Sequence, residues 1–153
     1  MSFFKTLFAA LILGGSAAAL AADTDTQFHL NELLSSDVTY QETWRDLVED
    51  ESRLPEWVMN LSGDARPMQG LEDDGDKYLV GQLCAVQNCF NQRLYTAFTW
   101  DKDTAYALYV QLPDGLPVGH VPSQHAILRW LGEPNEAVQT LLLEQLQKDP
   151  NWY

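Results

Sequence analysis

The only two cysteines of the chain, Cys84 and Cys89, lie five positions apart between two runs of residues that alternate as β-strands do. In an oxidising compartment their thiols can join and close a small ring. The pair therefore predicts that residues 78–83 and 92–100 form neighbouring antiparallel strands with the ring at their tip. A ring this short adds only about 2 kcal/mol of stability on the chain-entropy model. Its main consequence is that it fixes the conformation of the residues inside it, which are Ala85, Val86, Gln87 and Asn88.

Further alternating runs extend the predicted sheet. Residues 106–112 and 126–131 have the apolar pattern of strands, and another strand is expected at 67–71. The segments 72–76 and 101–104 are rich in aspartate, and the first also contains a glycine, so both indicate turns between strands. The middle of the chain is therefore predicted to be an antiparallel sheet.

Helices are predicted before these strands. Residues 37–52 have an apolar stripe at helical spacing that includes Trp44 and Val48. Asp37 or Thr39 is the expected N-cap of this helix. A second, short helix is expected at 54–59, because a proline at its second position suits the first turn of a helix.

A further helix is predicted after the strands, with Pro134 in its first turn and Pro150 beyond its end. Helices before and after a run of antiparallel strands indicate an α+β fold. The expected core lies between this helix and the strands, and it contains Leu94, Phe98, Tyr106, Leu108 and Val110 against Val138, Leu141, Leu142 and Leu146. The tryptophans expected in the core are Trp44, Trp57, Trp100 and Trp130.

The N-terminus has the features of a cleavable signal peptide over residues 1–22. Lys5 supplies the positive charge, residues 7–13 form a short apolar core, and small residues follow before the expected cleavage site. The apolar core is shorter than the roughly 20 residues that a membrane-spanning helix needs. We therefore expect export, no membrane attachment after cleavage, and a single domain over residues 23–153.

The charge of the chain restricts its partners. The sequence has 22 acidic and 9 basic residues and a formal net charge of −13, and loss of Lys5 with the signal peptide brings this to −14. Such a surface repels nucleic acids, so no nucleic-acid partner is expected, and it attracts cationic proteins. The alternative is a soluble acidic surface that serves no partner.

The sequence contains no residue pattern typical of catalysis, so the chain is not expected to be an enzyme. His120 and His125 lie five positions apart and not on a predicted helix face, and the chain lacks a His-Glu-x-x-His motif, so no cofactor or metal is expected. The two cysteines do not form a Cys-x-x-Cys redox motif. The acidic segment 72–76 lacks calcium-loop spacing and is interpreted as a solvated turn. Arg93 is either buried beside an acidic residue or exposed, and the sequence leaves both open.

Three motifs in this order resemble the inhibitor of vertebrate lysozyme (Ivy) family. They are Leu-Pro-Glu-Trp-Val at 54–58, Tyr-Leu-Val at 78–80, and Cys-x4-Cys-x2-Gln-Arg at 84–93. The resemblance implies an α-β-α sandwich in which helices flank a central antiparallel sheet, with a protruding disulfide-closed loop. It also implies a periplasmic protein, often a homodimer, whose loop enters the active-site cleft of C-type lysozyme. In that family a loop histidine meets the two catalytic carboxylates.

The ring of this chain departs from the family pattern Cys-Lys-Pro-His-Asp-Cys at every internal position. Ala85 replaces lysine, Val86 proline, Gln87 histidine and Asn88 aspartate. The ring is neutral, and a neutral donor at position 87 forms weaker hydrogen bonds than an imidazolium. We therefore expect weak or absent inhibition of vertebrate C-type lysozyme.

The resulting hypothesis is a periplasmic inhibitor that binds a peptidoglycan-cleaving enzyme through the loop Cys84, Ala85, Val86, Gln87, Asn88 and Cys89. The enzyme is a C-type lysozyme or a bacterial lytic transglycosylase, whose cleft has one catalytic acid in place of two carboxylates. The alternative is a family paralogue that kept the fold, lost inhibition and serves as a periplasmic binding or structural protein.

Overall fold

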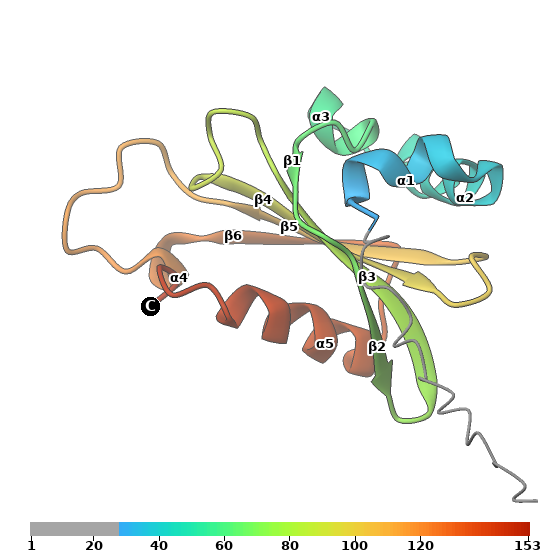
Figure 1. Cartoon of the computed structure of the whole chain (residues 1–153). Coiled ribbons are helices and arrows are strands. Elements are labelled where there is room, and N and C mark those ends of the chain that lie inside the picture. The colour runs from blue at the N-terminus through green and yellow to red at the C-terminus, as the bar shows by residue number, and fades with distance from the viewer. Residues whose placement is uncertain (1–27) are drawn as a thin grey trace, which may run out of the picture.

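The computed structural model describes residues 28–153, so the predicted signal peptide and the start of the predicted domain lie outside the described residues. Within these residues, six antiparallel strands form one sheet (Figure 1). Their bounds are β1 Asp64–Ala65, β2 Gln69–Asp73, β3 Asp76–Cys84, β4 Gln92–Thr99, β5 Ala105–Gln111 and β6 Ile127–Leu131. The predicted strands are therefore confirmed, and the two-residue strand β1 is an addition to them.

Strand β3 organises the sheet. One of its edges pairs with β4, while the other pairs with β2 along its first half and with β1 at its end, where Asp64 lies opposite Cys84. The order continues through β5 to β6. Because every pairing is antiparallel, the β3–β4 and β5–β6 connections leave the same end of the sheet, which we call the ring end.

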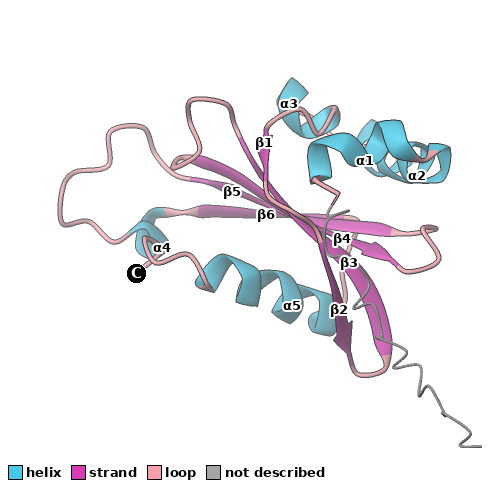
Figure 2. Cartoon of the chain, viewed as in Figure 1, coloured by secondary structure: helices cyan, strands magenta, loops and turns pink. Residues whose placement is uncertain are grey.

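Helices cover both faces of the sheet, as Figure 2 shows. Three of them, α1 Leu30–Ser36, α2 Val38–Glu49 and α3 Glu56–Met59, lie on one face, and α5 Glu136–Gln147 lies on the other. A short helix, α4 Pro122–His125, precedes β6. The expected α-β-α sandwich is confirmed. No helix in residues 28–153 is both long enough and apolar enough to cross a membrane.

The predicted helix ends lie within three residues of the observed ones, and the largest difference is at the end of the predicted helix 37–52, because α2 ends at Glu49. The side chain of Asp37 accepts a hydrogen bond from the backbone N–H of Thr39, so Asp37 is the N-cap of α2. Pro55 and Pro134 were predicted in the first turns of their helices, but both lie just before the first helical residue. Pro55 is the N-cap of α3, and Asn135 caps α5, which leaves Pro134 just outside that helix.

The core consists of two layers, one on each face of the sheet. Leu108, Val110 and Tyr106 face α5 as predicted. The prediction that Leu94 and Phe98 face α5 is wrong, because they pack with Trp44 under the N-terminal helices. Strand β4 is buried on both faces, and from Leu94 to Phe98 every residue except Thr96 is apolar, so alternation alone does not show which set faces which helix.

Trp100 is the one tryptophan of the predicted core set that is mainly exposed. It lies in the β4–β5 turn, 55% exposed, with the Lys77 ammonium 3.9 Å above its ring. The expectation that it belongs to the core is wrong. The turn begins one residue before the predicted Asp101, so Trp100 is past the last paired residue of the strand.

Candidate functional site

The ring forms as predicted at the tip of β3 and β4. Cys84 and Cys89 are joined by a disulfide, with their Cα atoms 4.7 Å apart. Within the ring, the N–H of Asn88 donates to the carbonyl of Ala85 over 3.0 Å and makes a tight turn. Gln87 has a φ of +61° in this turn, a conformation that few non-glycine residues adopt. The ring therefore has one defined backbone shape.

The tip of the ring is accessible, while its start is buried. Val86 is 56% exposed and Gln87 is exposed, whereas Ala85 is only 7% exposed. Phe90, just after the ring, is 46% exposed. A partner that approached the ring end would therefore meet Val86, Gln87 and Phe90. None of these side chains is charged, so the contact is neutral in character.

The base of the ring is held from the side of the N-terminal helices. The side-chain oxygen of Gln92 accepts hydrogen bonds from the indole N–H of Trp57 at 3.3 Å and the hydroxyl of Tyr109 at 3.1 Å. Burial raises the pKa of Tyr109, which keeps its hydroxyl protonated as the donor. A Cβ on Gly63 would lie 2.1 Å from the carbonyl oxygen of Cys84, so only glycine fits there.

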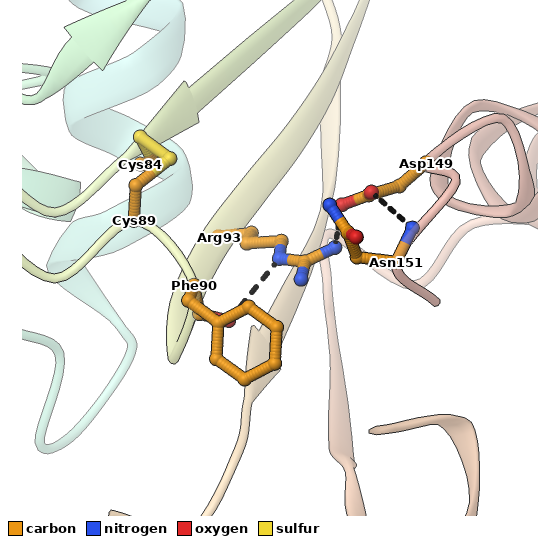
Figure 3. Close-up of polar contacts among 6 residues, drawn as sticks. All are labelled: Cys84, Cys89, Phe90, Arg93, Asp149 and Asn151. Carbon is orange, nitrogen blue, oxygen red and sulfur yellow. Dashed lines mark hydrogen bonds and ion pairs between the residues drawn. A yellow bond between two sulfur atoms is a disulfide. The ribbon is translucent and has the colours of Figure 1, made fainter. Parts of the chain in front are cut away.

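The base is also held from the side of α5, as Figure 3 shows. The guanidinium of Arg93 forms an ion pair with the carboxylate of Asp149 and donates from Nε to the carbonyl oxygen of Phe90 at 3.3 Å. Asp149 also accepts a hydrogen bond from the backbone N–H of Asn151 at 2.9 Å. The sequence left open whether Arg93 is buried beside an acidic residue or exposed. Arg93 is 3% exposed, so it is buried. The ring base is therefore connected to the segment after α5.

A second loop, residues 112–121 between β5 and β6, lies beside the ring base at the ring end. The N–H of Leu112 donates to the carbonyl of Asn91 at 2.8 Å, and the Asn91 amide reaches the Asp114 carboxylate at 3.4 Å. This loop exposes Val118 completely. The ring end therefore presents two loops that are hydrogen-bonded to each other near their bases.

In residues 28–153 no group of three or more His, Cys, Asp and Glu side chains is placed so that it could hold a metal ion. The acidic segment 72–76 forms the hairpin between β2 and β3, in which Asp74 and Gly75 have positive φ angles. This geometry agrees with a solvated turn.

Several residues of the ring base were not predicted as part of the site. Gly63, Tyr109 and Asp149 are far from the ring in sequence, and the last is 56 positions from Arg93. Two signals pointed toward such contacts. One was Arg93, a charged residue next to a ring between apolar strands. The other was Gly63, the glycine after the short helix.

Comparison with known proteins places these features in a family. The sequence model of the family described as inhibitor of vertebrate lysozyme (Ivy) matches residues 39–148. A Pseudomonas aeruginosa protein named inhibitor of vertebrate lysozyme is 38% identical over 153 residues, with 99% of each chain covered. Another protein of that organism, described as uncharacterised, is 57% identical over both full lengths. A Yersinia pestis protein, also described as uncharacterised, is 36% identical over 79% of this chain and 78% of its own.

Proposed function

The chain belongs to the inhibitor of vertebrate lysozyme family, and we propose that it inhibits a peptidoglycan-cleaving enzyme in the periplasm by inserting the Cys84–Cys89 ring into the enzyme's cleft. The observation that supports this most is the combination of an exposed ring tip with a ring base held from both faces of the sheet. A preorganised loop avoids the entropy cost of ordering when it binds.

The neutral ring favours one class of target. A cleft with two ionised carboxylates loses hydration when the ring enters, and Gln87 compensates for this with neutral donors only. A lytic transglycosylase cleft, with one catalytic acid, presents less charge to be compensated. We therefore propose a lytic transglycosylase as the preferred target and a C-type lysozyme as the weaker one.

The size of this preference follows from hydrogen-bond energies. A bond to a charged group contributes about 1.5–3 kcal/mol and a neutral one about 1 kcal/mol. The difference of about 0.5–2 kcal/mol corresponds to roughly 2- to 30-fold in affinity. Replacing Gln87→His together with Asn88→Asp should therefore strengthen inhibition of C-type lysozyme by about that factor.

The experiment titrates a C-type lysozyme and a lytic transglycosylase with the mature protein and measures residual activity and complex formation. Val86→Asp should weaken inhibition, because it puts a charge on the ring tip. Val38→Asp is the matched control, since Val38 is 64% exposed on α2 and Val86 is 56% exposed. Equal inhibition by both variants would show that the ring does not enter the cleft.

The acidic surface gives a second readout. It should attract cationic enzymes, so their association rate should fall as salt rises. If the mature protein inhibits neither enzyme and forms no complex at low salt, the inhibitor proposal fails and a paralogue without inhibition becomes the better interpretation.

A further inference from the structure

A pair of histidines lies in the second loop and the short helix that follows it. The Nδ1 atom of His120 is 3.3 Å from the Nε2 atom of His125, and the ring centroids are 5.2 Å apart at an interplanar angle of 40°. Both residues are exposed. The proposed inhibition by the ring does not use this pair.

The separation of the two nitrogen atoms matches that of two ligands on one metal ion. Zinc binds imidazole nitrogen at about 2.0–2.1 Å in tetrahedral geometry. Two such bonds at the tetrahedral angle place their nitrogen atoms about 3.3–3.4 Å apart. The 3.3 Å observed between His120 and His125 is this spacing. A hydrogen bond between the two imidazoles would have the same length. The distance therefore fits both a hydrogen-bonded pair and a pair of metal ligands, and a metal titration distinguishes them.

The backbone around the pair is held by hydrogen bonds, two of them local and one to the end of the chain. The N–H of His120 donates to the carbonyl of Pro117 at 3.1 Å, and the N–H of Ala126 donates to the carbonyl of Pro122 at 3.1 Å. The N–H of Ser123 donates to the carbonyl of Trp152 at 3.0 Å, which ties α4 to the end of the chain. Two ligands held in place bind a metal with less loss of conformational entropy than two on a flexible loop.

We propose that His120 and His125 bind a divalent transition-metal ion, Zn²⁺ or Cu²⁺, with the remaining coordination positions open to water. Imidazole is a ligand that these ions prefer. The described residues contain no third His, Cys, Asp or Glu ligand beside the pair, so the site is a two-ligand site and not a closed structural one. The net charge of −13 over the full sequence raises the local concentration of cations around the protein.

The chain offers a matched control for testing this proposal. It has three histidines, and His29, at the start of α1, forms no part of the pair. The mature protein, free of any histidine tag, is titrated with Zn²⁺ by calorimetry as wild type, His120→Asn, His125→Asn and His29→Asn. Unchanged thermal midpoints in the absence of metal establish that each variant is folded.

The expected result is saturable binding of one Zn²⁺ per chain by the wild type and by His29→Asn, and a loss of at least about 10-fold in affinity in each of the other two variants. In NMR spectra, Zn²⁺ should shift the imidazole signals of His120 and His125 and leave those of His29 in place. The proposal is overturned if the wild type shows no saturable binding, or if His120→Asn and His125→Asn bind Zn²⁺ as the wild type does. Because inhibition is not measured, the outcome is independent of the proposed function.

Discussion

Removal of the Asp149 carboxylate should destabilise the protein far more than removal of a surface carboxylate. Asp149 forms an ion pair with Arg93, and their side chains are 21% and 4% exposed. Asp149→Ala would leave the guanidinium buried without a counter-charge. Breaking a buried pair in this way costs about 3–5 kcal/mol. Because Asp149 is partly accessible, water can reach the vacated space, and we expect a value near 3 kcal/mol.

Urea denaturation measures this cost. With a slope of about 2 kcal/mol per molar urea, a loss of 3 kcal/mol lowers the midpoint by about 1.5 M. Asp46→Ala is the matched control, because Asp46 pairs with Arg45 and their side chains are 69% and 64% exposed. An exposed pair contributes only about 0–1 kcal/mol.

Two further variants separate charge from turn geometry. Asp149→Asn keeps an oxygen that can accept from the N–H of Asn151, so a large loss of stability in this variant comes from the missing charge. The double replacement of Arg93 and Asp149 by leucine should recover much of the stability, because no unpaired charge remains buried. If Asp149→Ala costs no more than Asp46→Ala, the pair does not stabilise the ring base and the reasoning is refuted.

Three shorter predictions test other parts of the fold. Leu108→Ala should cost about 2–5 kcal/mol in urea denaturation, because Leu108 is fully buried against α5. Lys102 holds the pKa of Asp37 below its ordinary value of 3.8, so the stability from this pair is present above that pH and lost as pH falls through the lowered pKa. Asp37→Asn should therefore lower the thermal midpoint at pH 7, and the difference from wild type should shrink below about pH 3.8. Gly63→Ala should lower the urea midpoint through the steric clash at the ring base. Gly70→Ala should change it little, because its Cβ would meet only side-chain atoms at ordinary contact distances, the end of Lys77 at 3.4 Å and the ring of Trp100 at 3.7 Å.

The local features of this fold could be predicted from the sequence, and the long-range ones could not. The ring needed only two cysteines and the alternation on both sides of them, and the N-cap at Asp37 needed only its neighbours. Helix α1 was missed because seven residues give too little periodicity for recognition. The partner of Arg93 could not be found, because any of many acidic residues could have supplied the carboxylate.

The error in the core has a similar cause. Alternation shows which residues share a face of a strand, but it identifies the covering helix only when the other face is polar. Both faces of β4 carry buried apolar residues, Tyr95 and Ala97 toward α5 and Leu94 and Phe98 toward the N-terminal helices. The choice between them depends on the topology of the whole sheet.

The shape of the ring and its chemistry are determined by different residues. The turn is fixed by the disulfide and by backbone hydrogen bonds such as that from Asn88 to Ala85, and the base is fixed by Gly63, Gln92 and Arg93. The exposed side chains at the tip form none of these contacts. The left-handed conformation at position 87 supports this separation, because His, Asn and Asp adopt it more readily than glutamine does. Gln87 therefore has a conformation set by the ring and not by its own preference. It follows that the ring would present another side chain at this position in the same place. Under the proposed inhibition, the charge of that side chain would then select the target enzyme while the scaffold stays unchanged.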